Sequence, residues 1–348
     1  MKTHLQILTF ALFAILLGTS CRPQETKLKT TLFETFEQED YVNLELTADW
    51  ASVLAGKEEE QKFVASIQWL ASNGSTQQMP IQLERRGKTR LNHCNFPPLK
   101  LIFDRDSLTN NAIGGGRKLK LVTHCNGDEA LVLREYLAYQ MYQQLTDKSF
   151  RVQLAKITYI DASGQASTET HWGFLLENHH DLAERLDAKL LKTKTASLRT
   201  IDSEQYRTMA LFQYMIGNTD WNMKLRHNIK MVQLADRACP TPIPYDFDYS
   251  GLVNAPYASP HPIMPVADVR ERYFQWRGKD AGGFATTIQH FIDHKTDLLQ
   301  LCQQFAHLPE AQRIEMTDYL ESFYQKIEGL NRNYNDLVSV LNEHVTVS

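Results

Sequence analysis

The amino-acid sequence changes its pattern near residue 178, and this change limits the fold more than any other feature. Between residues 40 and 125 there are short apolar runs with partial alternation, separated by polar or glycine-containing turns. This pattern indicates antiparallel strands in meander order, namely YVNLELTA, KFVASIQWLA, MPIQLERRG, PLKLIFD and KLKLVTH. A helix is predicted over residues 129–145, with Asp128 in its capping turn, and two more strand-like runs follow at 152–161 and 172–178.

Beyond residue 178 the apolar residues mostly recur at helical spacing, and Ser203 is the predicted N-cap of the first long helix. Strands first and helices second are typical of the α+β class. We therefore expect a β-rich lobe with one helix over residues 36–178 and a mostly helical lobe over residues 179–348. A cleft between two such lobes is a natural place for a ligand.

The N-terminal residues have the pattern of a secretion signal. A mostly apolar run from Leu5 to Gly18 is too short to span a bilayer comfortably, and small residues precede Cys21. This favours a lipoprotein signal over residues 1–20, a lipid on the thiol of Cys21 and a tether over residues 21–35. The alternative is an ordinary secretory signal cut near the same place. We expect a protein of the cell envelope, outside the cytoplasm, that touches the membrane only through its lipid.

Composition and cysteine content restrict the class of protein further. Hydrophobic residues make up 43% of the chain and aromatic residues 10%, which is ordinary for a globular enzyme, and the net charge of −4 argues against nucleic-acid binding. Cys94 and Cys125 each follow a histidine, which suggests either a zinc site of two His and two Cys or a disulfide between neighbouring strands. No CxxC spacing is present, and an oxidising compartment favours the disulfide.

Polar residues at the start of the second half of the chain are the candidates for a functional site. Asp220 follows an apolar helix, Asn228 opens the strand-like run NIKMVQL, and Asp246 ends the strand-like run TPIPY, with Asp248 two residues later. Phosphoryl transfer uses a carboxylate that orients the nucleophile, a metal held by carboxylate and amide oxygens, and a cation on the phosphates. Hard oxygen ligands of this kind suit Mg²⁺ or Mn²⁺.

These stretches resemble those of a known family. The segments GNTDWNMKLRHN and PIPYDFDYSG are similar to the spore-coat CotH-type kinase family, which pairs an Asp-containing loop ending in His-Asn with a Pro-x-Asp-x-Asp run. LERRGKTR, REYLAYQMY and WGFLLENHHDLAERL resemble further stretches of that family in the same order, so the similarity covers roughly residues 40–255. The resemblance implies an atypical protein-kinase-like fold with two lobes.

The resemblance also implies a role for each matching residue. Asp220 would be the catalytic base or hydroxyl-orienting carboxylate. Arg86 and Gly87 would lie in the loop that faces the phosphates of ATP or another nucleotide. Glu135 would pair with a phosphate-binding lysine, and both Lys100 and Lys120 are candidates. The metal, Mg²⁺ or Mn²⁺, would be held by Asn228, Asp246 and Asp248.

Three functions stay open at the level of sequence. The first is metal-dependent phosphoryl transfer from a nucleotide to a hydroxyl of a protein or small molecule. The second is a catalytically inactive kinase-like lipoprotein that binds or scaffolds in the envelope, since ATP is scarce there. The third is a metal-dependent phosphoesterase that uses Asp220, Asp246 and Asp248. Each residue also has a simpler interpretation, such as a turn at Asp220 or an Asx-turn at Asp246.

Overall fold

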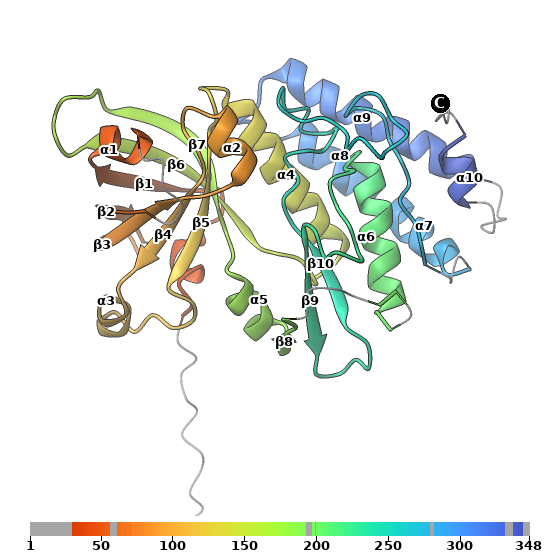
Figure 1. The fold of residues 1–348 in the computed structure, drawn as a ribbon, viewed down its shortest axis with the longest axis horizontal. Helices are drawn as coiled ribbons and strands as arrows, with labels where there is room; N and C mark the ends of the chain where they lie inside the picture. The colour runs from red at the N-terminus through yellow and green to blue at the C-terminus, as the bar shows by residue number, and fades with distance from the viewer. Residues whose placement is uncertain are drawn as a thin grey trace, which may run out of the picture.

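The structure is a computed structural model that describes residues 30–55, 61–71, 73–192, 197–198, 200–278, 282–330 and 337–343. The predicted signal over residues 1–20, Cys21 and the first part of the predicted tether lie outside the described residues. The fold belongs to the α+β class, as predicted. Figure 1 shows a strand-rich half on one side and a helical half on the other. None of the helices among the described residues has the length and apolarity needed to cross a membrane.

Seven strands form a closed barrel in the order β1-β2-β3-β4-β5-β7-β6. Inward-facing leucines and isoleucines from successive strands fill the barrel, which explains why the sequence alternates. The antiparallel pairing from β1 to β5 agrees with the predicted meander. The parallel pairing of β1 with β6, which closes the barrel, was not predicted. The strands are β1 Tyr41–Ala48, β2 Lys62–Leu70, β3 Thr76–Arg85, β4 Leu99–Phe103, β5 Lys118–Thr123, β6 Val152–Asp161 and β7 Glu169–Leu176.

The strand-rich half contains more helical structure than the one helix predicted. A 3₁₀ turn, η1, precedes β1, and short helices lie in three connections between strands. The side chains of Leu32, Phe33 and Phe36 are fully buried against the barrel, so the predicted tether over residues 21–35 extends too far at its C-terminal end. The added elements are η1 Glu34–Phe36, α1 Trp50–Ala55, α2 Lys88–His93 and α3 Arg105–Asn110.

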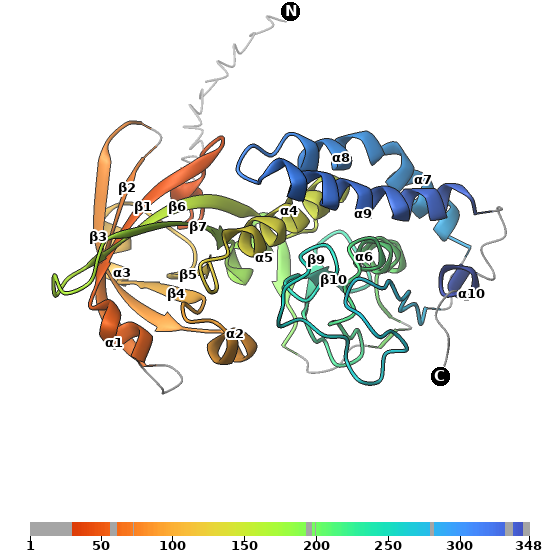
Figure 2. The same ribbon diagram turned by 90° about the horizontal axis from the view of Figure 1, so that it is seen from above.

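Helix α4 (Glu129–Leu145) lies between the two halves of the molecule, as Figure 2 shows from above. Its N-cap is Asp128, whose side chain accepts a hydrogen bond from the N–H of Ala130, as the sequence suggested. Most of its circumference is buried, because the barrel covers one side and the C-terminal helices cover the other. Burial extends to the polar side chain of Glu135, which is 1% exposed.

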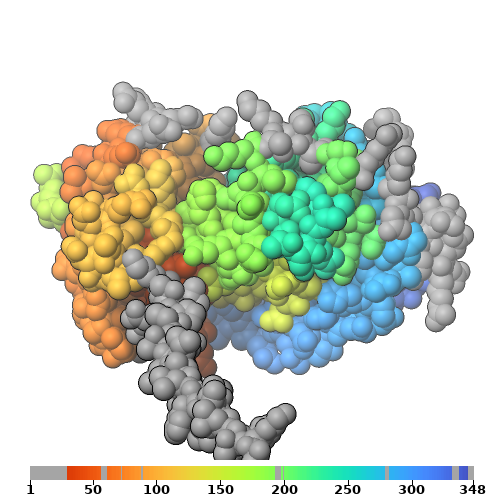
Figure 3. Space-filling model, turned by 90° about the horizontal axis from the view of Figure 1, so that it is seen from below, coloured from red at the N-terminus to blue at the C-terminus, as the bar shows by residue number. Residues whose placement is uncertain are grey.

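The second half joins a small sheet to a layer of helices. A three-stranded antiparallel sheet has the order β10-β9-β8. In the view from below, the green segment of α5 and β8 lies between the orange barrel and the teal β9–β10 hairpin (Figure 3). The elements are α5 His179–Arg185, β8 Ala188–Leu190, α6 Ser203–Met215, β9 Ile229–Leu234, β10 Thr241–Pro244, α7 Phe284–Asp293, α8 Lys295–Gln303, α9 Glu310–Glu328 and α10 Leu337–Leu341.

The N-cap of α6 differs from the predicted one by a single position. The cap is Asp202, whose carboxylate accepts from the N–H of Gln205, and Ser203 is the first helical residue. Both side chains are suitable for capping. Asp202 is the N-cap because its backbone is extended, whereas the backbone of Ser203 is already helical.

The cysteines form the predicted disulfide. Cys94, which caps the C-terminal end of α2, is bonded to Cys125, which follows β5. This pairing excludes the zinc alternative, because both thiolates that such a site needs are in the disulfide. Cys239 and Cys302 are free thiols.

Replacing Asp181 with Asn should stabilise the fold above neutral pH. Burial raises the pKa of the Asp181 carboxyl to about 6, although the N–H of Gly116 donates to its Oδ1 at 2.7 Å. The folded state thus binds this proton more tightly than the unfolded state. The ionised carboxylate therefore lowers the free energy of unfolding most above pH 6, and this loss disappears on acidification. We expect a gain of about 1 kcal/mol at pH 8 and none at pH 3, below the unfolded-state pKa of about 3.9, measured by urea unfolding. The exposed Asp318→Asn serves as the control, and a variant less stable than wild type at pH 8 would contradict the prediction.

Candidate functional site

A cleft of about 230 Å³ lies where the barrel meets the second half of the molecule. It brings together five parts of the chain: the β3–β4 connection with α2, strand β5, helix α4, the α6–β9 loop and the segment after β10. All of the predicted catalytic, phosphate-loop and metal residues line this cleft except Lys100 and Lys120. The lining residues are Arg86, Gly87, Thr89, Arg90, Pro98, Val122, Glu135, Asp220, His227, Asn228, Asp246, Asp248 and Tyr249.

The Asp-Phe-Asp run after β10 alternates between the core and the cleft. Phe247 is fully buried, and its ring packs against those of Tyr139 and Phe212 at centroid distances of 4.6 and 5.4 Å. The aspartates on either side of this anchor line the cleft. The backbone N–H of Asp246 donates to the hydroxyl oxygen of Tyr139 at 2.8 Å, so helix α4 fixes the position of this residue.

The α6–β9 loop orients the carboxylate of Asp220. Nε2 of His227 lies 3.0 Å from Oδ1 of Asp220, and Nδ2 of Asn228 donates to both the carbonyl oxygen and Oδ2 of Asp220, at 2.8 and 3.0 Å. Since two acceptors face one end of the Asn228 amide, that end is the nitrogen, and Oδ1 is left as an acceptor. The side chain of Asp220 is 32% exposed, which leaves it accessible to a substrate hydroxyl.

Two of the predicted metal ligands have a costly backbone conformation. Asn228 has a φ of 54° and Asp246 a φ of 70°, in the left-handed region that residues other than glycine seldom occupy. The N–H of Tyr245 donates to the carbonyl of Asn228 at 3.0 Å and links the two positions. Backbone strain of this kind, on the order of 1–3 kcal/mol per residue, concentrates at functional sites.

Arg90 of α2 is the cation of the site, and the sequence analysis did not identify it. Its guanidinium pairs with Glu135 through Nη2 and with Asp248 through Nε at 3.0 Å, and its side chain is 9% exposed. Tyr257 donates a further hydrogen bond to the same oxygen of Asp248 at 3.1 Å. Arg90 ends the run LERRGKTR, four residues after Arg86. That spacing would place both on one side of a helical turn, but nothing in the run indicated a helix.

The predicted pairing of Glu135 with a lysine is wrong. Lys100 pairs with Glu84, its direct neighbour on the adjacent strand β3. Lys120 lies 5.1 Å from the centre of the Tyr245 ring. Both lysines lie on the outer face of the barrel, where they are partners in register, and Arg90 takes the position opposite Glu135.

The acidic side chains of the cleft repel one another. Glu135, Asp246 and Asp248 each offer a carboxylate oxygen within 4.8 Å of the others. Burial, and then the neighbouring acids, raise the pKa of Glu135 and of Asp248, and the Arg90 guanidinium opposes this rise. Burial disfavours the charge on Arg90, but attraction from Glu135 and Asp248 outweighs burial and raises its pKa. Three carboxylates against one guanidinium leave two negative charges, which fits a divalent cation with oxygen ligands.

A second cavity of about 640 Å³ is lined by residues of α5, β8 and the start of β9 and is basic. Lys230 lines it and also lies 5.2 Å from the centre of the Tyr245 ring, on which Lys120 is placed as well. Burial, and then the positive charge of Arg86, lower the pKa of Lys120 to about 7, although Asp246 opposes this. Two lysines over the ring of Tyr245, the residue before Asp246, provide a place for an anionic ligand. The lining residues are His179, His180, Leu190, Leu191, Lys192, Leu225, Arg226, Ile229 and Lys230.

Comparisons with known proteins give a likeness at the level of solved structures. No family model matches the sequence, and no curated protein matches it. Among solved structures, a proinflammatory kinase of Helicobacter pylori, CtkA, resembles this chain with a TM-score of 0.40 and 11% sequence identity. The alignment covers 69% of this chain and 94% of that kinase. The likeness is too low to assign the chain to the family of that kinase.

Proposed function

We propose that this chain is a metal-dependent phosphotransferase with a two-lobed, protein-kinase-like architecture of the CotH type. The proposal rests mainly on one observation: Asp220, Asn228, Asp246 and Asp248 line one cleft. Along the chain, Asp220 lies in the loop after α6, Asn228 directly precedes β9, and the Asp-Phe-Asp run follows β10. The strained backbones of Asn228 and Asp246 support the proposal. Conformational strain of this kind persists mainly at functional sites, and here it would let both residues present oxygens to one ligand.

The residues divide the chemistry among themselves. Asp246, Asp248 and the Oδ1 of Asn228 would hold Mg²⁺ or Mn²⁺, which shields the negative charge of the phosphates when bound. Asp220, held by His227 and Asn228, would orient the acceptor hydroxyl and accept its proton. Arg86 and Gly87 line the same cleft and would face the phosphates.

The basic cavity would hold the rest of the nucleotide. Lys230 and Lys120, which both lie over the ring of Tyr245, would contact its phosphates. Leu190, Leu191 and Ile229 provide an apolar surface for a base, and the donor would be ATP or another nucleotide.

One observation favours a second function, a catalytically inactive kinase-like protein that binds or scaffolds in the envelope. The resemblance implies a lysine opposite Glu135, whereas Arg90 occupies that position, and Lys100 is held by Glu84. An arginine engaged with two buried carboxylates is less free to follow a phosphate than a lysine would be.

Calorimetry on the chain without residues 1–21 tests both functions. Titration with ATP, with and without Mn²⁺ or Mg²⁺, should give metal-dependent binding, and transfer of labelled phosphate to the protein itself or to an added hydroxyl acceptor should follow. Binding without transfer would support the scaffolding function. If the protein binds no nucleotide with either metal, the phosphotransferase proposal fails.

We also propose that the protein is anchored outside the cytoplasm by a lipid on Cys21. Replacing Cys21 with Ser removes the thiol that carries the lipid, so the variant should move from the membrane fraction to the soluble fraction. Detergent extraction followed by immunoblotting measures this, with Cys239→Ser as the matched control. A Cys21→Ser protein that still partitions with membranes would refute the anchor.

A further inference from the structure

The short helix α2 depends on tertiary contacts for its stability. It has six residues, its N-cap Gly87 makes no side-chain hydrogen bond, and the φ of Gly87 is 87°. Isolated helices of this length are unstable in water, so tertiary contacts must hold it in place. These contacts decide where Arg90 lies, because Arg90 is part of this helix.

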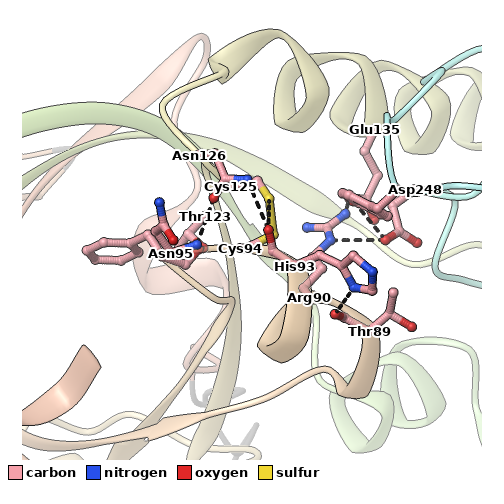
Figure 4. Close-up of a disulfide and its surroundings, with 12 residues drawn as sticks. Thr89, Arg90, His93, Cys94, Asn95, Thr123, Cys125, Asn126, Glu135 and Asp248 are labelled. Carbon is pink, nitrogen blue, oxygen red and sulfur yellow. Dashed lines mark hydrogen bonds and ion pairs between the residues drawn. A yellow bond between two sulfur atoms is a disulfide. The ribbon is translucent and has the colours of Figure 1, made fainter. Parts of the chain in front are cut away.

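Most of the contacts at its C-terminal end lead to the β5–α4 connection. Cys94 is bonded to Cys125 (Figure 4). The side chain of Asn126 accepts from the N–H of Asn95 at 2.7 Å and donates to the carbonyl of His93 at 2.9 Å. The disulfide is the one covalent tie among these contacts, and it joins α2 to the segment that leads directly into α4, the helix of Glu135.

At the other side of the helix, Arg90 connects three elements. Its guanidinium lies between Glu135 of α4 and Asp248 of the segment after β10, as Figure 4 shows. Each carboxylate uses one oxygen for Arg90, and Asp248 uses that same oxygen for Tyr257. The other oxygens of Glu135 and Asp248 remain for a metal ion. Loss of a group that orients ligands in this way typically weakens metal affinity about 10- to 100-fold.

We propose that the Cys94–Cys125 disulfide is a redox-controlled clamp that positions Arg90 between Glu135 and Asp248, so that the cation site of the cleft is assembled only in the oxidised protein. This inference rests on the metal site of the proposed function. Arg90 is a positioning residue in it, since it acts through the two carboxylates. On reduction, α2 loses its covalent tie, Arg90 leaves the buried pair, and the uncompensated carboxylates move apart.

The redox step is an ordinary thiol–disulfide exchange. A dithiol donor attacks the Cys94–Cys125 bond, gives two electrons and two protons to yield two cysteine thiols, and becomes a disulfide itself. Cys94 and Cys125 are themselves 8% and 6% exposed, but His93, Asn95 and Asn126, which flank the bond, are exposed, so the segment that carries it lies at the surface.

The test measures Mn²⁺ binding and the position of Arg90 separately. The full chain is purified in detergent and compared in its oxidised form and after reduction, alkylation and desalting, beside Cys94→Ser/Cys125→Ser. Calorimetry with Mn²⁺ alone should show affinity about 10- to 100-fold weaker in the last two. Trypsin should cut after Arg90 only when the clamp is open, which peptide mass spectrometry detects without any metal. Cys239→Ser should behave as wild type in both assays.

Coupling between the clamp and Arg90 distinguishes positioning from general stability. Arg90→Leu should weaken Mn²⁺ binding as much as reduction does, and reduction of Arg90→Leu should weaken it no further. A merely structural disulfide would instead give additive losses that follow the melting temperature. If the oxidised protein binds Mn²⁺ and the reduced one binds it equally, with Arg90 still protected, the clamp is refuted while the proposed function stands. No Mn²⁺ binding by the oxidised protein would overturn both.

Discussion

Metal-dependent nucleotide binding should be lost when Asp246 is replaced with Asn. The change removes one negative charge from the carboxylate cluster, and the neutral amide is a poor ligand for Mg²⁺ or Mn²⁺. Even groups that only orient ligands cost 10- to 100-fold in metal affinity, so a direct ligand should cost at least about 100-fold. The fold should tolerate the change, because Asn accepts the left-handed backbone of this position and keeps its N–H bond to Tyr139.

Calorimetric titration with Mn²⁺ and ATP measures the effect, beside a thermal melt of the same variant. Asp236→Asn is the matched control, because Asp236 is exposed between β9 and β10 and lies close in sequence to the site. The prediction fails if Asp246→Asn binds Mn²⁺ and ATP with the affinity of wild type.

Asp220→Asn should behave in the opposite manner, with binding kept and turnover lost. Asp220 is expected to orient the acceptor hydroxyl, and an amide cannot accept its proton, so the rate of phosphate transfer should fall about 10²- to 10⁴-fold. The dissociation constants for Mn²⁺ and ATP should stay within about threefold of wild type, because Asp220 is not among the three clustered carboxylates.

Transfer of labelled phosphate and calorimetry on the same preparation separate these two effects. His227→Gln is a useful companion, since it keeps a hydrogen-bond donor near Asp220 and should reduce the rate much less. A structural role for both aspartates gives a different pattern, in which each variant melts at lower temperature and neither acts selectively on ligand or rate.

The parts of the site that the residue pattern itself could predict are close together along the chain, whereas Arg86, Gly87 and Glu135 were expected only from the family resemblance. Asp220, Asn228, Asp246 and Asp248 lie within one loop and hairpin, so their order alone indicated a shared cleft. The strands of the barrel were predictable for a similar reason, since each carries its own alternation and its neighbours follow directly.

Arg90 could not be found in this way, because its role depends on contacts across the fold. Its partners lie 45 and 158 residues away, and the helix that carries it has no capping signal of its own. Lys100 and Lys120 could not be distinguished by sequence either. They are direct partners in the β4–β5 register on one face of the sheet, and the strand pattern is the same for both.

The parallel pairing of β1 with β6 also sets the order in which the molecule can fold. Tyr41 of β1 pairs with Leu154 of β6, so roughly a hundred residues must be synthesised after β1 before its second neighbouring strand is available. Closing so long a loop costs conformational entropy before the strand contacts that offset this cost can form. Barrel closure is therefore a late and slow event. A newly made chain therefore stays open while β6 is unfinished, and such a delay suits translocation in the unfolded state, the route that our proposed export of this protein requires.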